Sequence, residues 1–363
     1  MNPNELNGCT EALQTERAVE EIRRGRAIEL VEKENIWLIA VVDTLEQPVF
    51  HHLQSTYNDS IKLLLTPQRA KAAGLCEDQT NPLELDLQRN IKLDELRALA
   101  GFEPSFSKDV ILNAKPSENL KVASAAFRLA KLGKLLPSLL ITPSKSANHS
   151  NVVSINTTDI NAPELVGQKL KLISKARVPL LDSAKCEIAV FRQQQGFGEH
   201  LAIVIGTPDP KTTTPVRLHS ACLTGDLLGS LRCDCGDQLR RAVSHMNSLG
   251  GGVLLYLDQE GRGIGLTNKL RAYALQDAGL DTLDADQYLG FLPDERTYEV
   301  AAAMLKEIKI TKIKLLTNNP SKIDALKSHG INVTGRLPLI APVNSHNQRY
   351  LKAKLDRAGH LSE

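Results

Sequence analysis

In the second half of the chain, short apolar runs alternate with stretches of helical periodicity, and this alternation restricts the fold more than any other feature. The predicted strands are Leu201–Ile205, Val216–His219, Val253–Leu257 and Ile313–Thr317. The predicted helices are Asp237–Met246, Leu266–Asp277, Asp294–Ile308 and Pro320–Ser328. Because parallel strands need a crossover, which is usually a helix, this order predicts an α/β fold with a mixed, partly parallel sheet.

The first half predicts a second, smaller α/β domain. Apolar spacing predicts helices in 16–25 and 117–136, and strands at 27–31 and 36–42. Residues 143–163 are rich in Ser, Asn and Thr and poor in apolar residues, which is typical of a linker. A length of 363 residues fits two domains. We therefore expect an N-terminal domain over 1–142, a linker over 143–165 and a C-terminal domain over 166–363.

Charge and hydropathy exclude several classes of protein. Lys and Arg total 44 against 42 Asp and Glu, a net charge of +2, which argues against a nucleic-acid binder. No apolar run approaches the roughly 18 residues that a membrane span needs. The polar segment Met1–Thr10 lacks the pattern of a signal peptide. We expect a cytoplasmic protein that binds neither nucleic acid nor membranes.

Three of the six cysteines, Cys222, Cys233 and Cys235, fall within fourteen residues. In a reducing compartment such a cluster indicates a metal site rather than disulfides. Three thiolates suit Zn²⁺, and a fourth position left to water would make the site catalytic. The alternative is a closed structural site in which His219 is the fourth ligand.

The glycine-rich segment 250–266 predicts a strand, a turn and the start of a helix. Its backbone amides are candidates for phosphate binding. It is not the dinucleotide fingerprint, because the third glycine falls at 265 rather than 266, and no P-loop motif occurs in the chain. Glu260 and Arg262 are residue types that pair with guanine edges and phosphates. The alternative is an ordinary tight turn.

Further candidates follow this turn. Tyr273 shares a predicted helix face with Leu266 and Leu270, and the alternative is a core tyrosine. Asp294 lies at a predicted helix start, where its negative charge complements the helix dipole. The positive charge of Arg296 is unfavourable there, which makes Arg296 a candidate functional residue. The alternative for Arg296 is an ordinary surface side chain. We expect Asn319 to cap a helix that has Pro320 at its first position. Asn319 and Lys322 together form a candidate anion site. The alternative is a turn whose charged side chains are solvated.

These motifs together resemble GTP cyclohydrolase II of riboflavin biosynthesis. The likeness covers roughly residues 170–363 and rests on His219–Asp226, Cys233–Gly236, Gln259–Arg262, Arg271–Leu275, Asp294–Arg296 and Leu316–Pro320. It implies an enzyme that hydrolyses GTP to 2,5-diamino-6-ribosylamino-4(3H)-pyrimidinone 5′-phosphate, formate and pyrophosphate. It also implies a homodimer, Mg²⁺ with the triphosphate, and one Zn²⁺ per subunit held by Cys222, Cys233 and Cys235 with water as fourth ligand, which argues against ligation by His219.

The resemblance also implies roles for single residues. Tyr273 would assist hydrolysis at C8 of the guanine ring, and Asp294 would accept a proton. Arg296 matches a proposed nucleophile at the α-phosphorus, but a guanidinium keeps its proton, so a phosphate clamp is the alternative. The positions that match GTP contacts are Arg217, Leu218, His219, Ser220, Ala221, Gln238, Glu260, Gly261, Arg262, Thr282, Thr317 and Lys322.

The chain departs from the family pattern at Ala221, where the family usually has Glu. Residues 18–25 and 125–137 faintly resemble 3,4-dihydroxy-2-butanone-4-phosphate synthase, but the acidic elements of that family are missing, so we expect a degenerate, non-catalytic domain. Two alternatives remain for the chain. One is a related enzyme that stops at a formamide intermediate or at pyrophosphate release, and the other is a nucleotide-sensing or protein-interaction module with a structural zinc.

Overall fold

The computed structural model describes residues 10–57, 60–77, 80–144, 151–161, 170–193 and 198–340, together with 342–345, 347–348, 352, 359 and 361. The chain divides into two compact units. The N-terminal unit comprises Met1–Leu165 and Ile264–Glu295, and the C-terminal unit comprises Val166–Gly263 and Arg296–Glu363. A segment from the second half of the sequence, Ile264–Glu295, thus belongs to the N-terminal unit.

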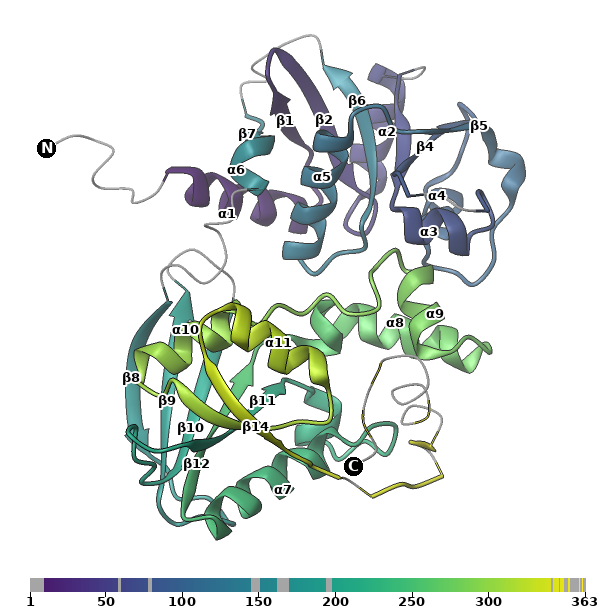
Figure 1. The fold of residues 1–363 in the computed structure, drawn as a ribbon. Coiled ribbons are helices and arrows are strands. Elements are labelled where there is room, and N and C mark those ends of the chain that lie inside the picture. Colours follow the sequence, from purple (N-terminus) through teal and green to yellow (C-terminus); the bar gives the residue numbers. More distant parts are fainter. Residues whose placement is uncertain are drawn as a thin grey trace, which may run out of the picture. The chain divides into compact units, whose positions relative to one another are not determined.

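The N-terminal unit is built on a sheet with the strand order β5-β4-β3-β6-β2-β1-β7 (Figure 1). Its strands are β1 (Ile28–Glu32), β2 (Asn35–Val41), β3 (Lys62–Leu65), β4 (Leu83–Leu87), β5 (Ile111–Pro116), β6 (Ser138–Ser144) and β7 (Ser154–Asn156). Neighbouring strands are antiparallel except for β1 and β7, which are parallel. Its helices are α1 (Thr10–Arg23), α2 (Gln47–Tyr57), α3 (Pro67–Ala72), α4 (Leu93–Ala100), α5 (Leu120–Leu132), α6 (Thr157–Asn161), α8 (Leu266–Asp277) and α9 (Thr282–Tyr288), with a 3₁₀ turn, η2 (Lys108–Val110).

Both faces of this sheet are buried. Leu38 and Ala40 of β2 pack with Phe50 of α2 and Leu96 of α4 in one apolar cluster. The alternate residue Ile39 is 1 % exposed on the other face, where α5 contacts β1, β2 and β6. The predicted strands and helices of the first half are therefore confirmed as an α/β layer structure.

The segment 143–165, predicted as a linker, contains regular structure. Residues 154–156 form β7, which pairs with β1, and residues 157–161 form α6, which packs on α1 and α5. The sequence pattern did not predict these elements because both are short and contain few apolar residues. Their buried apolar side chains are Ile155 and Ile160, which are 3 % and 0 % exposed.

The C-terminal unit contains the sheet β14-β13-β11-β12-β10-β9-β8. Its strands are β8 (Leu170–Arg177), β9 (Cys186–Gln193), β10 (Glu199–Gly206), β11 (Thr214–Ser220), β12 (Gly251–Leu257), β13 (Lys312–Leu316) and β14 (Asn332–Leu337). Strands β14, β13, β11 and β12 are parallel, and β12, β10, β9 and β8 are antiparallel. The predicted mixed, partly parallel sheet is confirmed.

Helices cover both faces of this sheet. Val216 and Leu218 of β11 pack with α10 (Glu299–Glu307) and α11 (Pro320–Ser328) on one face. Helix α7 (Cys235–Ser248) lies on the other face (Figure 1), where Leu254 of β12 packs with it. Two short helical turns, η4 (Leu223–Leu227) and η5 (Glu260–Gly263), follow β11 and β12.

One predicted helix begins later than expected. The predicted helix Asp294–Ile308 starts at Glu299, so Asp294 and Arg296 lie in irregular chain ahead of it. The Glu295 carboxylate accepts the Leu292 backbone N–H at 2.7 Å within this irregular segment. The dipole argument for Asp294 and Arg296 therefore does not apply.

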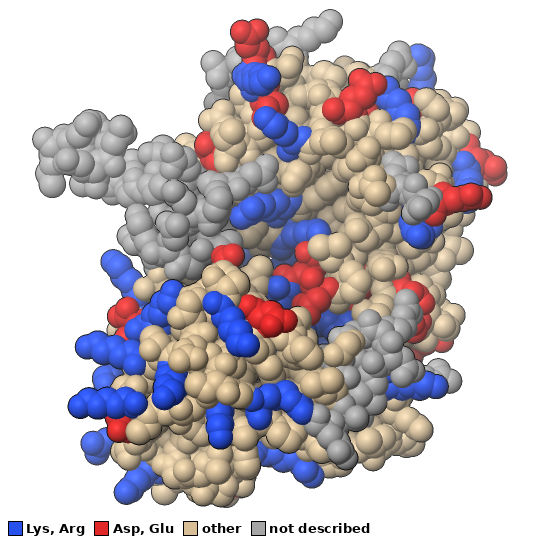
Figure 2. Space-filling model, in the orientation of Figure 1, with Lys and Arg blue, Asp and Glu red and all other residues tan. Residues whose placement is uncertain are grey.

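The outer strand β8 is exposed along most of its length and carries Lys171, Lys175 and Arg177. Charged side chains on an edge strand discourage pairing with other chains. Figure 2 shows Lys and Arg side chains gathered over this part of the C-terminal unit. Among the described residues, no helix combines the length and hydropathy needed to cross a membrane.

Candidate metal centre

The predicted site residues of the C-terminal unit lie at one edge of its sheet. Because β11, β12 and β13 are parallel, the segments that follow them emerge at the same edge. Cys222 follows β11, Glu260 follows β12, and Thr317 follows β13. The helix α11 then starts with Asn319 as its cap, whose side chain accepts the Ser321 N–H, and with Pro320 in its first turn, as the sequence predicted.

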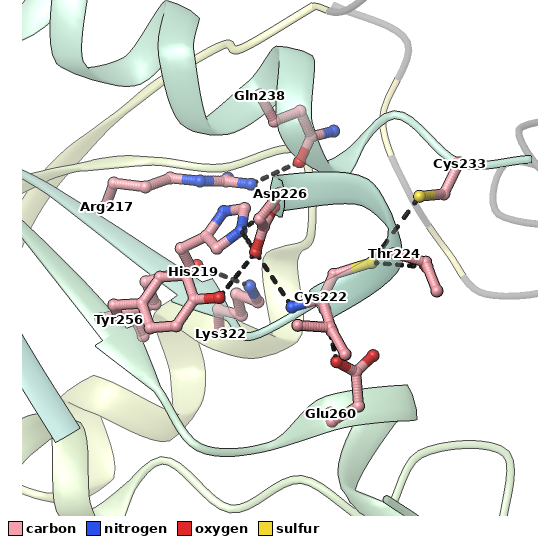
Figure 3. A network of polar contacts seen from close by, with 12 residues as sticks. Arg217, His219, Cys222, Thr224, Asp226, Cys233, Gln238, Tyr256, Glu260 and Lys322 are labelled. Atoms are coloured by element: carbon pink, nitrogen blue, oxygen red, sulfur yellow. Dashed lines mark hydrogen bonds and ion pairs between the residues drawn. The ribbon is translucent and has the colours of Figure 1, made fainter. Parts of the chain in front are cut away.

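The sulfur atoms of Cys222, Cys233 and Cys235 lie within 4.8 Å of one another. The Sγ atoms of Cys222 and Cys233 are 3.7 Å apart, and both side chains are buried (Figure 3). Within the described chain, this is the one group of three or more His, Cys, Asp or Glu side chains placed to hold a metal ion. Three thiols at this spacing fit a thiophilic ion such as Zn²⁺.

Gly225 gives the three thiols their space. A Cβ at this position would lie 2.8 Å from the Cys233 sulfur and 3.0 Å from the Cys222 sulfur. A Cβ at Gly236 would lie 2.3 Å from the Gly225 carbonyl oxygen, so the two backbones are in close contact. The turn η4 and the start of α7 thus form a cradle that only glycine permits.

Asp226 connects this cradle to the sheet. Its carboxylate accepts hydrogen bonds from Nε2 of His219 at 3.0 Å, from the Tyr256 hydroxyl at 2.9 Å and from the Cys222 backbone N–H at 2.9 Å (Figure 3). His219 and Tyr256 are register partners on β11 and β12, and their rings stack with centroids 5.5 Å apart. His219 is therefore occupied by Asp226 and is not among the residues that converge as metal ligands.

Burial fixes the protonation states in this network. Desolvation lowers the pKa of the His219 imidazole, although Asp226 opposes this shift. The neutral ring then carries its proton on Nε2, because the acceptor there is a carboxylate. Burial and the Asp226 charge raise the pKa of the Tyr256 hydroxyl, which remains a donor.

Cationic side chains gather around the buried ring of Tyr298. The Lys322 Nζ lies 5.7 Å from the ring centroid and the Arg296 guanidinium carbon 5.9 Å from it. Burial lowers the pKa of the nearby Arg217 guanidinium to about 10, and Arg296 also lowers it. These three residues create the positive potential that a polyphosphate would need.

The contacts of Arg217 and Lys322 hold them in place. Arg217 donates to the Leu316 carbonyl at 2.9 Å and to the side chain of Gln238. Lys322 is 6 % exposed and donates to the Leu218 carbonyl at 3.0 Å, so the alternative of a solvated charge is wrong for this residue.

Several polar atoms at this sheet edge lack a hydrogen-bond partner in the described part of the chain although they are buried. They are Nε of Arg217, Nδ1 of His219, Oγ of Ser220 and Oε1 of Gln259. Buried polar groups are nearly always paired, so a group of orphaned atoms is typical of a site that awaits a polar ligand.

The turn after β12 is strained at one residue. Gly261 and Arg262 both have left-handed backbone geometry, with φ of 62° and 59°. Glycine adopts this geometry freely, but it is uncommon for arginine. The Glu260 carboxylate accepts the Leu223 N–H at 2.6 Å and so ties this turn to the residue after Cys222 (Figure 3).

Two further predicted residues of the C-terminal unit are held by local hydrogen bonds. Ala221 is half-buried, and its N–H bonds to the Leu257 carbonyl at 2.8 Å. Thr317 is buried, and its hydroxyl accepts the Asn319 N–H at 3.0 Å.

Tyr273, Thr282 and Asp294 belong to the N-terminal unit. Tyr273 is half-buried beside the exposed Leu270, so the alternative of a core tyrosine is not what the structure shows. Asp294 is exposed. Thr282 starts α9, and its side chain lies outside the described part of the structure.

Sequence reasoning did not single out Gly225, Asp226, Tyr256 or Gln259 as site residues. Three of them lay inside or beside the quoted motifs, and a buried glycine between cysteines is a usable signal. Tyr256 carried no signal, because only the parallel pairing of β11 with β12 places it beside His219.

Comparisons with known proteins agree on one family. A family model described as GTP cyclohydrolase II matches residues 171–338. A protein of Azospirillum brasilense named GTP cyclohydrolase-2 is 40 % identical over 358 residues, which cover 95 % of this chain and 93 % of that protein. A protein of the same name from Xylella fastidiosa (strain 9a5c) is 38 % identical over 97 % of this chain and 88 % of its own length. Both alignments extend through the N-terminal half.

Among solved structures, a two-domain 3,4-dihydroxy-2-butanone 4-phosphate synthase from A. baumannii aligns with 90 % of this chain and 99 % of its own. The TM-score is 0.33 and the identity 16 %.

Proposed function

The chain belongs to the GTP cyclohydrolase II family of hydrolases, and we propose that it converts GTP to 2,5-diamino-6-ribosylamino-4(3H)-pyrimidinone 5′-phosphate, formate and pyrophosphate. This would be the first step of riboflavin biosynthesis. One water would add at C8 of the guanine ring, a second would release formate, and a third would be consumed when pyrophosphate leaves.

The observation that carries this proposal is the convergence of three thiols on Gly225, at the sheet edge where several buried polar atoms have no hydrogen-bond partner among the described residues. Cys222, Cys233 and Cys235 would hold one Zn²⁺ per subunit. When bound there, zinc supplies an activated water at neutral pH by lowering its pKa. His219 would stay outside the ligand set, because its ring nitrogens are not among the ligand atoms that converge with the three sulfurs in the described chain.

The remaining residues bind and orient the nucleotide. Arg217 and Lys322 would attract the triphosphate with its Mg²⁺, and Arg296 would hold the α-phosphate as a clamp, because a guanidinium that keeps its proton is a poor nucleophile. Tyr273 would assist ring opening at C8, and Asp294 would accept a proton. The further residues proposed to contact GTP are Leu218, His219, Ser220, Ala221, Gln238, Glu260, Gly261, Arg262, Thr282 and Thr317.

A single incubation tests the reaction. With GTP, Mg²⁺ and Zn²⁺, formate and pyrophosphate should be released in equal amounts, with the absorbance of the pyrimidine product. Pyrophosphate without formate would identify an enzyme that stops early, and release of neither from the zinc-loaded protein would rule out the proposed activity.

The ligand set has its own test. Cys233→Ser should lose bound zinc and formate release together, whereas Cys76→Ser, a half-buried cysteine outside the cluster, should keep both. The absorption spectrum of the cobalt-substituted protein distinguishes three sulfurs plus water from three sulfurs plus imidazole. A spectrum with imidazole would contradict the assignment of His219.

We also propose that the N-terminal unit has no synthase activity. In the described part of that unit, no group of three acidic or histidine side chains is placed to hold a metal ion. Incubation with ribulose 5-phosphate and Mg²⁺ should yield no butanone phosphate, and robust formation would contradict the proposal. A homodimer in the cytoplasm, implied by the family resemblance, is tested by light scattering and cell fractionation.

A further inference from the structure

Three residues to which the family resemblance assigns roles lie in the segment that packs with the first half of the chain. This segment, Ile264–Glu295, carries Tyr273, Thr282 and Asp294 and belongs to the N-terminal unit. Its apolar side packs into a cluster that includes Leu136 and residues of α8 and α9. An otherwise unassigned half of the protein therefore holds residues that the proposed reaction needs.

We propose that residues 1–165 act as a positioning scaffold for the cyclohydrolase reaction, in which Asp43 fixes Tyr273 through Arg271 and Lys131 fixes Asp294 through Glu295. The proposal rests on the function proposed above, because it concerns residues assigned to that reaction. It gives the N-terminal unit a task that does not require synthase activity.

The first link is a paired ion contact across the sequence. Oδ1 and Oδ2 of Asp43 accept from the two terminal nitrogens of Arg271 at 2.7 and 2.8 Å. Asp43 is 7 % exposed, and its Oδ2 also accepts the Leu136 N–H at 2.9 Å. A bidentate pair fixes both distance and orientation, and its shielding from water strengthens it.

Arg271 is fixed on other sides as well. Its guanidinium carbon lies 4.6 Å from the centroid of the Phe102 ring, and it donates to Asn268 at 2.8 Å. Asn268 donates in turn to the Lys134 carbonyl at 2.9 Å. The face of α8 that carries these residues is therefore held by polar contacts rather than by apolar packing alone.

This arrangement sets the direction of Tyr273. Asn268, Ala272 and Leu275 form the buried face of α8, whereas Leu270 is exposed and Tyr273 half-buried. In a helix, residues two positions apart point about 200° apart, so the contacts of Arg271 orient Tyr273 by fixing the rotation of α8. A small rotation would move the tyrosine hydroxyl more than the backbone.

The second link lies one residue from Asp294. The Lys131 Nζ lies 2.6 Å from Oε1 of Glu295, and both side chains are largely shielded from solvent. The same oxygen accepts the Leu292 N–H at 2.7 Å. Lys131 thus anchors the irregular chain at Glu295, next to Asp294.

The two links should affect the two products differently. The first link acts on Tyr273, which is proposed to assist ring opening. The second link acts on the segment at Asp294, which leads directly to Arg296, the proposed phosphate clamp. Asp43→Asn should lower the ratio of formate to pyrophosphate about tenfold or more, since small displacements of a reacting group cost up to about a hundredfold in rate. Lys131→Met should lower both products about tenfold with little change in their ratio.

A double-variant cycle tests whether Asp43 acts through Arg271. If it does, Asp43→Asn combined with Arg271→Gln should lower the ratio no further than the worse single variant. Glu20→Gln, which removes an exposed carboxylate of α1, is the matched control and should keep the wild-type ratio and rates.

The outcomes separate this inference from the proposed function. If the wild-type protein releases no formate from GTP, the proposed function fails. If the wild-type protein is active and folded Asp43→Asn keeps its ratio, the scaffold inference is wrong. Equal loss of both products in Asp43→Asn, in proportion to the loss of folded protein, would also overturn it. Should Asp43→Asn not fold, Asp43→Glu keeps the charge and displaces it by one methylene, and an unchanged ratio in that variant would contradict the inference.

Discussion

Nε2 of His219 lies 3.0 Å from Oδ1 of Asp226, and the same carboxylate accepts the backbone N–H of Cys222. Asp226 therefore links His219, a strand residue proposed to contact GTP, to Cys222, the first of the three cysteines. This link also means that Asp226 supports the metal cradle without being placed to hold the ion. Residues that orient ligands in this way affect metal affinity strongly.

Asp226→Asn should weaken zinc binding about 10- to 100-fold, because the amide offers one acceptor oxygen in place of two and presents donors to His219 and Tyr256. Competition with a chromogenic chelator measures the affinity. The control is Asp237→Asn on the exposed side of α7, where Asp237 pairs with Arg240. Equal affinities for both variants and the wild type would refute this role of Asp226.

Gly225→Ala should abolish zinc binding while the rest of the unit stays folded. The added Cβ would lie 2.8 Å from the Cys233 sulfur, closer than real contacts allow. Zinc released on denaturation and the circular dichroism spectrum measure the two effects. Gly229→Asn is the control, because Gly229 has φ +66°, which asparagine tolerates, and a Cβ there would meet no other described part of the chain within 4 Å. Full zinc content in Gly225→Ala would disprove the cradle.

Arg69→Met should destabilise the N-terminal unit by about 3 kcal/mol. Arg69 is 0 % exposed and donates to the carbonyls of Leu99 and Tyr288, which lie at the ends of α4 and α9. Methionine would leave these buried acceptors unpaired. The single tryptophan, Trp37 in β2, reports urea unfolding of this unit.

Arg24→Met is the comparison for Arg69. Arg24 is largely exposed and pairs with Glu20 at 3.5 Å, and such pairs contribute about 0 to 1 kcal/mol. An equal change in the urea midpoint of unfolding for the two variants would show that the buried hydrogen bonds of Arg69 stabilise the unit no more than the exposed ion pair of Arg24 does.

The contact between Thr157 and Glu32 should make stability depend on acid. The Thr157 hydroxyl donates to the Glu32 carboxylate and, with Lys121, lowers the pKa of that carboxyl from its usual 4.5. A lowered pKa in the folded state contributes stability that is present above pH 4.5 and is lost as the pH falls through the folded value. The Tm difference between wild type and Thr157→Val should therefore shrink between pH 7 and pH 3. A difference that stays constant would argue against the contact.

Much of the second half of the chain could be predicted from local pattern. The bounds of α8 and α11 match the predicted ones, and the predicted strands all correspond to strands of the sheet. The cap of α11 and the apolar runs of the strands are local signals, so nearby residues determine these segments. The predicted helix start at Asp294 is wrong, since the helix begins at Glu299, and Glu295 instead pairs with Lys131 of α5, 164 residues away.

The segment 143–165 shows the opposite kind of error. Its composition is typical of a linker, yet β7 completes the N-terminal sheet and α6 packs on two helices. Thr157 and Ile160 are buried only because α6 docks on structure already formed by the first 140 residues. Local composition cannot report a partner of this kind.

The amino-acid sequence by itself determined the alternation of strands and helices, the glycine-rich turn and the clustering of the three cysteines. Each of these features depends on the spacing of residues along a short stretch of chain. Tertiary structure alone decided that α8 joins the N-terminal unit and that Tyr256 meets Asp226. Asp43 and Arg271 are 228 residues apart, and contacts of that separation depend on how whole elements pack rather than on any local period.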